Sequence, residues 1–471
     1  MSKFHSSVSR RDFMKGLGLA GASIGALSAV APMFSDMDEV MGAPAGDLKR
    51  PWYVKEKDTP AVEIDWSLMK RYDKRIFSTG DFQKINDASK DLVLKLEGTT
   101  DINEAHSKWA KANTPGMTLR DQALWNGTQI SRSFEPPYTF LGPQKSKTPE
   151  ILGVPKWSAT PEENTRILRV AGRLFGAFTV GVAELNEQNI KIIWSNNGKQ
   201  DIVFEDVDEP YTTATKYVVP RKCKYVFVAD TRHGEHATKT APGAIINSAQ
   251  QIAYFTAAHM DSRFQEFLRT LGYSCLGTSP AGSASWPVMT GVGELGRGAN
   301  VITPEHGAMH RKFNFFFTDM PLAPTKPIDA GMNRFCYTCK KCGIQCPTST
   351  IPIETEPTWE GHGAWNNSGV KAWFLNYPTC GGKFDYKSTW GPGYCGMCMA
   401  NCVFSKFDDA NVHEIVKAVA STTSVFNAFF NNMDDTFQYG QNWRAHQMGD
   451  TYIEDWWNTM GPEFGYLTRT G

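Results

Sequence analysis

The stretch CYTCKKCGIQCPTST, residues 336–350, places four cysteines within eleven positions. Their spacing is C-x2-C-x2-C-x3-C and a proline follows the last of them, so the run consists of Cys336, Cys339, Cys342, Cys346 and Pro347. Bacterial ferredoxins carry this run, in which three thiolates hold one [4Fe–4S] cluster and the fourth reaches a second cluster. A crowded set of disulfides and a tetrahedral zinc site are the competing interpretations.

A second cysteine run decides between these interpretations. Its spacing is C-x14-C-x2-C-x3-C, which repeats the tail of the first run with one member displaced by an insertion. Eight cysteines in this double pattern favour two [4Fe–4S] clusters over zinc, because each cluster needs four thiolates that converge on one centre. Exchanging the fourth ligands between the runs gives the first cluster Cys336, Cys339, Cys342 and Cys402. The second cluster then takes Cys346, Cys380, Cys395 and Cys398.

The two remaining cysteines stand apart from these runs. Cys223 opens the strand-like sequence CKYVFVA, and Cys275 follows a helical stretch in LGYSCLG. A lone cysteine usually behaves as a small buried apolar residue. We expect both to belong to the core.

The N-terminus carries an export signal. In SVSRRDFMKGLGLAGASIGALSAVAPM, residues 7–33, Arg10 and Arg11 precede a Gly/Ala-rich run that is too short and too weakly apolar to span a membrane. This pattern predicts a twin-arginine signal peptide over residues 1–45, with an N-terminal amphipathic helix as the alternative. The twin-arginine route carries folded, cofactor-loaded proteins, which favours metal cofactors over disulfides.

Composition limits the partners of the chain. Lys plus Arg and Asp plus Glu both number 49, so the net charge offers no basic surface for nucleic acid. No apolar run after the signal reaches spanning length. We therefore expect an exported protein, any membrane attachment of which must come from a partner.

The remaining pattern predicts an α+β fold. Residues 46–155 are polar and punctuated by prolines, and we expect them to wrap the main domain. A helix is expected from Thr160 as N-cap and Pro161 as first helical residue. Apolar residues recur near helical spacing after this start, at Ile167, Val170, Leu174, Phe178 and Val182.

Strand-like runs come next and a long helical pattern follows them. The runs are KIIW (191–194), DIVF (201–204), KYVV (216–219) and CKYVFVA (223–229). The helical pattern covers residues 243–272 as one helix or a helix pair and ends at Gly272. Helix, strands and helices in this order indicate a layer built on a sheet, ahead of the cysteine-rich module.

Several cofactor motifs are absent from the sequence. GELGRG, residues 293–298, lacks the spacing of a dinucleotide-binding loop, and the chain has neither a phosphate loop nor a CxxCH haem attachment. The Asp-x-His-x-x-Gly pattern of corrinoid proteins that bind cobalt through histidine is also missing, since DTRHGEH at 230–236 matches it only superficially.

Together these features resemble the catalytic subunits of respiratory reductive dehalogenases. The similarity extends over nearly the whole chain, through GELGR, RKFNFFFTDMPL, FCYTCKKCGIQCPT and IEDWWN. It implies a nitroreductase-like corrinoid-binding domain over 156–328, a ferredoxin-like domain with two [4Fe–4S] clusters over 329–410, and a C-terminal extension over 411–471. The implied cofactor is a cobalamin-type corrinoid in its base-off form, bound without an axial histidine.

The resemblance also implies the reaction and its residues. Family members reduce a carbon–halogen bond with two electrons and a proton, as terminal reductases of a respiratory chain, and dock on a small membrane anchor protein. A tyrosine gives the proton and a basic residue stabilises its phenolate, which here points to Tyr254 and Arg311. Tyr273 and Lys312 are the alternatives, and a buried structural tyrosine and an ion-paired arginine are the plainer interpretations.

Other assignments stay open at this stage. His233, His236, His306 and His310 receive no role, since scattered histidines are usually structural. The stretch GTSPAGSASW, 277–286, offers no clear counterpart of the asparagine that family members place in the pocket. A chlorinated ethene and a chlorinated aromatic are both plausible substrates. The alternative functions are an iron–sulfur electron-transfer protein and a relative of the epoxyqueuosine reductases, which lack an export signal.

Overall fold

The computed structural model describes residues 50–78, 102–129, 139–277, 281–380, 395–405, 411–436 and 450–459. The expected signal peptide, 1–45, lies outside them. Within the described residues, none of the helices combines the length and the apolar character needed to cross a membrane.

A four-stranded antiparallel sheet forms the centre of the larger half of the molecule. Its order is β2-β6-β10-β7, and the strands are β2 (Val180–Glu184), β6 (Tyr225–Arg232), β10 (His310–Thr318) and β7 (Cys275–Leu276). Side chains of β10 alternate between two apolar clusters: Phe315 and Phe317 pack on one face, and Phe316 packs on the other. Both faces are therefore buried, as a period-two pattern of bulky residues requires.

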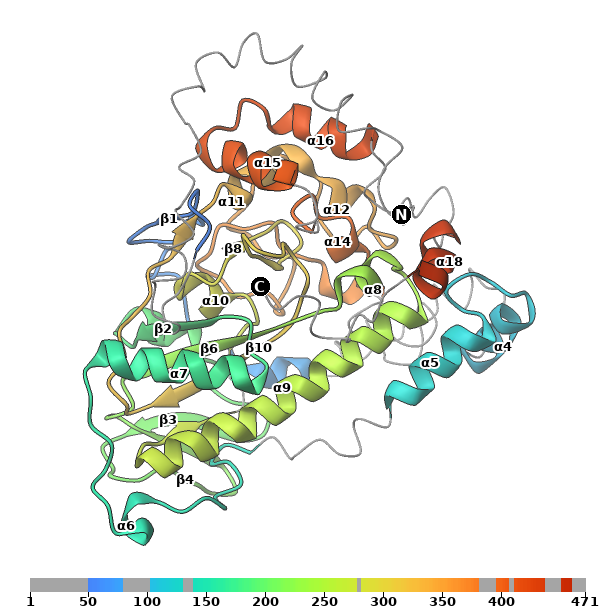
Figure 1. The fold of residues 1–471 in the computed structure, drawn as a ribbon. Helices are drawn as coiled ribbons and strands as arrows, with labels where there is room; N and C mark the ends of the chain where they lie inside the picture. Colours follow the sequence, from blue (N-terminus) through green and yellow to red (C-terminus); the bar gives the residue numbers. More distant parts are fainter. Residues whose placement is uncertain are drawn as a thin grey trace.

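Two helices cover one face of this sheet (Figure 1). The long helix α9 (Ala244–Leu271) contacts β6, β7 and β10, and α7 (Pro161–Phe175) packs against α9 and β2. Gly272 ends α9 in the left-handed conformation, with φ 90°. The prediction of a helical segment ending at this glycine is confirmed, and it forms one helix rather than a pair.

The start of α7 is also as predicted, but its apolar face is not. Thr160 caps the helix by accepting a hydrogen bond from the backbone N–H of Glu163 at 3.2 Å. Gly176 ends the helix, so the expected continuation to Val182 is wrong: that residue lies on β2. Leu174 is 83% exposed, and α7 buries Leu168 and Gly172 instead.

A second, smaller sheet packs beside the central one. Its order is β3-β5-β4, with strands β3 (Asp201–Glu205), β5 (Lys216–Pro220) and β4 (Tyr211–Thr212). Three of the predicted strands are confirmed: DIVF lies on β3, KYVV lies on β5, and most of CKYVFVA lies on β6 of the central sheet. KIIW is not a strand: residues Asn189–Ile192 form the 3-10 helix η4, whose isoleucines fill the core without strand pairing. The predicted core positions of Cys223 and Cys275 are confirmed, since both are buried.

The cysteine-rich half lies against the sheet end of the molecule, above it in Figure 1. It contains α11 (Met332–Cys339), α12 (Lys341–Ile344), η5 (Tyr377–Thr379), α14 (Met397–Ala400), α15 (Asn411–Thr422) and α16 (Asn427–Thr436). The strand pair β8 (Glu294–Leu295) and β9 (Val301–Ile302) joins it to the sheet. An apolar cluster that includes Phe335, Phe404 and Phe430 holds these short elements together.

Segments from the start of the chain pair with this half. Strand β1 (Lys55–Glu56) pairs with β11 (Ile328–Asp329), which directly precedes α11. Helices α4 (Ile102–Lys111) and α5 (Leu119–Gln129) lie beside the beginning of α9, near α18 (Asp450–Thr459) (Figure 1). The shorter elements are η2 (Lys74–Ser78), α6 (Pro149–Leu152), α8 (Glu235–Lys239) and α10 (Ser285–Met289).

Candidate active site

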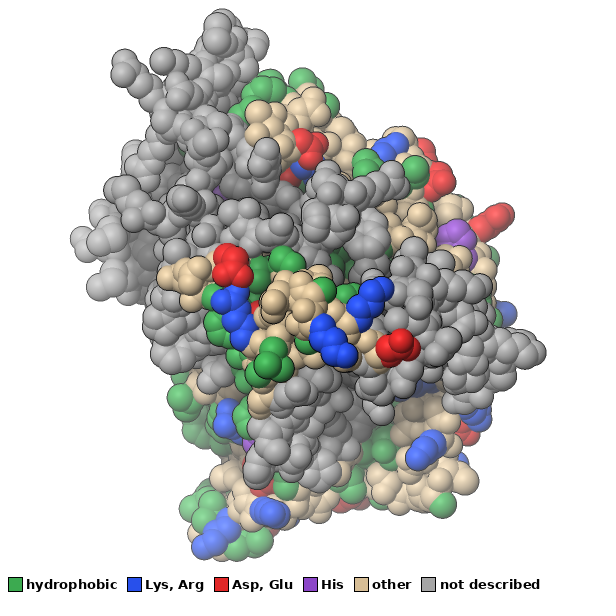
Figure 2. Space-filling model, turned by 90° about the vertical axis from the view of Figure 1, so that its right-hand side faces the viewer, with side chains coloured by type: hydrophobic (Ala, Val, Ile, Leu, Met, Phe, Trp, Pro, Cys, Tyr) green, Lys and Arg blue, Asp and Glu red, His purple; other side chains and the backbone are tan. Residues whose placement is uncertain are grey.

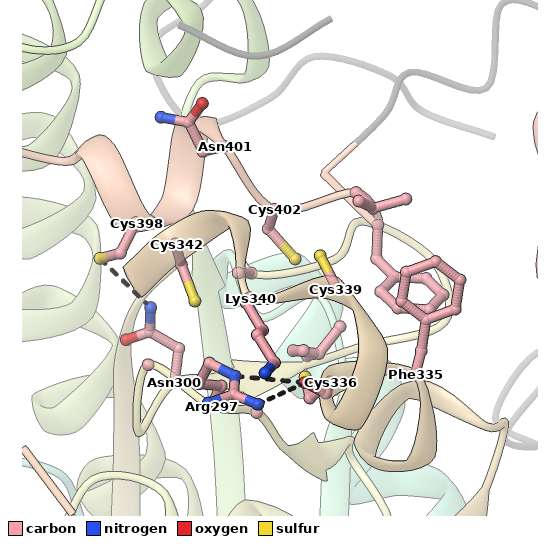
Figure 3. Close-up of a pocket in the computed structure, with 16 residues that line it drawn as sticks. Arg297, Asn300, Phe335, Cys336, Cys339, Lys340, Cys342, Cys398, Asn401 and Cys402 are labelled. Carbon is pink, nitrogen blue, oxygen red and sulfur yellow. Dashed lines mark hydrogen bonds between the residues drawn. The ribbon is translucent and has the colours of Figure 1, made fainter. Parts of the chain in front are cut away.

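Four cysteines surround one cavity in the cysteine-rich half. Cys336 and Cys339 lie on α11 and Cys342 on α12, and Cys402 follows α14. All four line the same cavity, which a fifth cysteine, Cys398, also lines, and Figure 3 shows the sulfurs of the four around a shared space. Lys340, at φ 59°, separates the two helices. This break turns the chain so that cysteines on both sides of it reach the same centre.

The other four cysteines form a second, adjoining set. Cys398 lies on α14, Cys395 directly before it, and Cys380 directly after η5. Burial and the sulfurs of Cys398, Cys380 and Cys346 together raise the pKa of Cys395 well above its usual value. The same burial and the neighbouring Cys380 and Cys346 raise the pKa of Cys398 to about 12. Cys346 therefore lies with this set, although it belongs to the first run in sequence.

The chemistry of both sets fits a soft metal centre. Buried thiols with raised pKa values stay protonated unless a bound cation holds them as thiolates. Two N–H groups also reach the sulfurs of the second set: the backbone N–H of Thr350 donates to Cys346 Sγ at 3.3 Å, and Asn300 Nδ2 donates to Cys398 Sγ at 3.5 Å. Such N–H···S contacts are a usual feature of iron–sulfur sites.

The GELGR segment fixes the position of α11. Glu294 is buried, and its carboxylate accepts hydrogen bonds from the backbone N–H groups of Ala330 at 2.5 Å and Asn333 at 2.8 Å, at the start of the helix. Arg297, three residues later, donates from Nη2 to the carbonyl of Cys336 at 2.8 Å. The Glu294 carboxyl group therefore satisfies backbone N–H groups at the helix N-terminus, although burial raises its pKa to about 7. The positive Arg297 contacts a carbonyl nearer the C-terminus, which matches the helix dipole.

Tyr254 and Arg311 meet across the interface between α9 and the sheet. Arg311 Nη2 donates a hydrogen bond to the Tyr254 hydroxyl, and its guanidinium carbon lies 4.5 Å from the centre of the phenol ring. Burial alone would raise the pKa of Tyr254. The adjacent Arg311 charge, with smaller contributions from Lys312 and Gln250, outweighs burial and lowers that pKa below its ordinary value.

A bulge in β10 explains how Arg311 reaches this position. His310 pairs with Arg232 and Lys312 pairs with the next residue of β6, Thr231, so Arg311 is the extra residue between two paired positions. Regular alternation would place Arg311 on the face opposite Lys312. A bulge re-aims a side chain locally, and here both Arg311 and Lys312 interact with residues of α9.

A polar stripe on α9 extends from this pair. Asn247, Gln250, Gln251 and Tyr254 share one face of the helix, at helical spacing. With its amide oriented to satisfy its neighbours, Gln250 accepts from Arg311 Nη2 and Nε, both at 3.1 Å. Asn247 is 1% exposed, and its side-chain nitrogen has no hydrogen-bond partner among the described residues. This orphaned donor is available to a further polar group.

The two alternative residues, Tyr273 and Lys312, have other partners. The Tyr273 hydroxyl donates to the carbonyl of Trp157 at 2.8 Å, next to the surface. Lys312 forms an ion pair with Asp261 at 3.5 Å, and Asp261 also accepts from Asn314 at 2.7 Å. Burial, partly offset by Lys312, raises the pKa of Asp261 to about 6.

A buried histidine cluster at the start of β10 was not assembled by the sequence analysis. His310 Nδ1 lies 2.7 Å from Asp230 Oδ1, its Nε2 lies 3.0 Å from the carbonyl of Gly307, and His306 Nε2 lies 3.4 Å from Asp230 Oδ2. Burial raises the pKa of Asp230, but the neighbouring His310 and His306 outweigh it and lower that pKa to about 2. In the sequence, the motifs DTRHGEH (230–236) and EHGAMH (305–310) could have indicated this cluster. The pairing of β6 with β10 brings the two motifs together.

Known proteins resemble this chain in sequence. A family model described as reductive dehalogenase subunit matches residues 49–322. A chloroethene reductive dehalogenase of Dehalococcoides mccartyi (strain VS) is 31% identical, and the alignment covers 99% of this chain and 99% of the relative. The chain belongs to the reductive dehalogenase family. It is therefore an oxidoreductase of the class that acts on carbon–halogen bonds.

Other members of the family support this placement. A tetrachloroethene reductive dehalogenase of Sulfurospirillum multivorans is 32% identical, over 67% of this chain and 64% of its own length. The solved structure of the catabolic reductive dehalogenase NpRdhA matches with a TM-score of 0.59 and 20% identity, over 86% of this chain and 50% of that protein. The chain thus spans about half the length of that structure and shares its mixed α and β fold.

Proposed function

We propose that this protein is the terminal reductase of an organohalide respiration chain, with a chlorinated ethene as substrate. The overall reaction adds two electrons and one proton to the substrate, replaces its carbon–chlorine bond with a carbon–hydrogen bond and releases chloride. Relatives over nearly the full chain are named chloroethene and trichloroethene reductive dehalogenases, which favours an ethene over an aromatic substrate. The observation that carries the proposal is the hydrogen-bonded pair of Tyr254 and Arg311 beside the polar stripe of α9, where we place the pocket for substrate and cofactor.

The electron path in this proposal consists of two [4Fe–4S] clusters. Their ligands are Cys336, Cys339, Cys342 and Cys402 for the first and Cys346, Cys380, Cys395 and Cys398 for the second. The second set lies nearer the polar stripe of α9, because Cys395 packs against the apolar cluster that contains Ile246 of that helix. Electrons would therefore pass from the first cluster to the second and then to the pocket.

The pocket is proposed to bind a cobalamin-type corrinoid, in a nitroreductase-like domain over 156–328 that precedes a ferredoxin-like domain over 329–410. One structure of similar fold is described as suggesting a mechanism for B12-dependent dehalogenation. A corrinoid supplies the strongly reducing cobalt that breaks the carbon–halogen bond. Asn247 and the amides beside it would hold polar groups of the cofactor, since corrinoids carry several amide side chains.

The protein's own part in the reaction is proton delivery. Tyr254 donates its phenolic proton to the carbon that loses chlorine, and Arg311 stabilises the phenolate that remains. A free phenol near pKa 10 is a weak acid at neutral pH. A guanidinium keeps its charge at any working pH, so Arg311 stabilises the phenolate throughout. Both side chains are partly buried, which strengthens this interaction because less water screens it.

The cellular setting is part of the same proposal. The twin-arginine signal over 1–45 directs the folded, loaded protein to the outer face of the cytoplasmic membrane. There a small integral membrane protein anchors it, and an upstream donor of the respiratory chain reduces the first cluster.

Anaerobic reconstitution tests the proposal. The protein is loaded with corrinoid, iron and sulfide, its cobalt and iron contents are measured, and halide release is followed with reduced methyl viologen. The panel holds chlorinated ethenes, chlorinated phenols and a brominated analogue. We expect one cobalt, about eight irons, and chloride release that is fastest with an ethene. A protein with its irons but no cobalt and no halide release would instead be an electron-transfer protein.

A further inference from the structure

Arg297 is a charged residue that the proposed reaction does not use. It belongs to GELGR, its side chain is 1% exposed, and it is among the largest fully buried side chains of the described residues. Burying a guanidinium is costly unless its hydrogen bonds are made and its charge is balanced. Both conditions can be checked for this residue.

The hydrogen bonds of Arg297 go to uncharged groups. Its Nε and Nη2 donate to the carbonyl of Cys336 at 3.2 and 2.8 Å, and its Nη1 donates to the carbonyls of Pro352 at 2.9 Å and Glu354 at 2.7 Å. The guanidinium also lies 4.3 Å from the centre of the Trp373 ring. The hydrogen bonds are therefore satisfied, while these partners leave the positive charge unbalanced.

The first cysteine set lies beside this unbalanced charge. Arg297 lines the same cavity as Cys336, Cys339 and Cys342, and Figure 3 shows its guanidinium beside Cys336 at the edge of that space. The buried charge thus faces the place where a thiolate-ligated cluster would carry its negative charge.

We propose that Arg297 positions the ligand helix of the first cluster and raises the reduction potential of that cluster. The inference rests on the proposed iron–sulfur function. Reduction adds one negative charge to the cluster, and a fixed positive charge in a water-poor site stabilises the reduced form more than the oxidised form. A higher potential lets the first cluster accept electrons from a weaker donor.

The test is a redox titration of the reconstituted full-length protein, followed by electron paramagnetic resonance. Arg297→Gln removes the charge but keeps a hydrogen-bond donor, whereas Arg297→Lys keeps the charge. We expect Arg297→Gln to shift one of the two cluster potentials to a more negative value and to leave the other unchanged. Arg297→Lys should stay nearer the wild-type value, with the iron content of both variants unchanged.

Arg71→Gln is the matched control. Arg71 also donates to three backbone carbonyls, those of Ile193, Trp194 and Ile202, and lies 5.7 Å from the centre of the Phe204 ring. None of these residues lines the cysteine cavity. This variant loses the same kinds of contact without losing a charge beside the cluster, so both potentials should remain at their wild-type values.

The outcomes separate the inference from the function on which it rests. The role of the Arg297 charge would be overturned if the potentials of Arg297→Gln were unchanged, or if Arg297→Lys showed an equal negative shift. Neither result would contradict the proposed reductase function. A wild-type protein without any [4Fe–4S] signal would overturn the proposed function itself. If Arg297→Gln fails to take up iron, Arg297→Met, which keeps an unbranched but uncharged side chain, replaces it under the same criteria.

Discussion

Tyr254 and Arg311 lie 57 positions apart and meet because one residue of β10 does not follow the strand pattern. Family resemblance was enough to select both residues from the sequence. The reason for their contact was not available there, since a strand alternates its side chains and the bulge that breaks the alternation depends on pairing with β6. The resemblance therefore pointed to this pair but not to the geometry that brings the two side chains together, and their chemical role stays a prediction.

The first prediction concerns the phenol of Tyr254. Tyr254→Phe removes the proposed proton donor but preserves the ring that stacks on Arg311. We expect halide release to fall by about 10²–10⁴-fold, the usual contribution of a general acid, with cobalt and iron contents unchanged. Tyr273→Phe is the control: its hydroxyl bonds only a surface carbonyl in the described structure, so its rate should match wild type. Equal rates in both variants would contradict the assignment of Tyr254.

At the scale of elements, α11 depends on a glycine that the sequence did not single out. Gly331 caps the helix at φ 76°, and a Cβ there would lie 2.2 Å from the carbonyl oxygen of Ala420 on α15. The two helices therefore approach each other through the backbone of this glycine. Its role depends on a neighbour about ninety positions later, so local propensity could not indicate it.

The second prediction follows from this contact. Gly331→Ala should lower the free energy of unfolding by more than the about 1–3 kcal/mol that a left-handed non-glycine residue costs, because Ala420 must also move. Gly153→Ala is the control, since Gly153 has a similar φ of 69° but open space around it. Thermal unfolding of the two variants, measured by circular dichroism, compares them. A loss in Gly331→Ala no larger than in Gly153→Ala would show that the close contact has no energetic weight.

Helices and strands with local signals were the most predictable elements. The Thr160 cap and the glycine after α9 fixed two helix ends, and both agree with the structure. KIIW was misassigned as a strand because a short apolar run fits a buried 3-10 turn equally well. The exposed position of Leu174 has the same kind of origin: which face of α7 is buried depends on α9, not on α7 alone.

At the scale of the whole molecule, the grouping of the cysteines is the part of the candidate site best predicted from sequence. Spacing alone separated eight proposed ligands from two core cysteines, and the structure places the eight in two adjoining sets, while their role as cluster ligands stays a prediction. The sequence did not indicate the polar residues around the cysteine sets, which are Glu294, Arg297 and Asn300. Their contacts come from packing between β8, β9 and α11. Residues that hold a cluster from outside its ligand run leave no spacing pattern.

The third prediction tests the distribution of ligands between the two sets. Cys346→Ser should disturb the second cluster and leave the spectrum of the first intact, although Cys346 lies only four residues after Cys342. Cys342→Ser should do the reverse. Iron content and electron paramagnetic resonance of the two variants provide the comparison. The same cluster disturbed in both variants would mean that the first run serves a single cluster.

The pairing of β1 with β11 also has a consequence for the order in which the chain is made. Lys326 and Asp58, which form an ion pair beside these strands, are separated by 268 positions. The N-terminal segment therefore leaves the ribosome early and waits for its partner until the chain has been synthesised almost to α11. An N-terminal signal would therefore precede a segment that can dock only at this stage. Docking of that segment would then indicate that synthesis has passed β11.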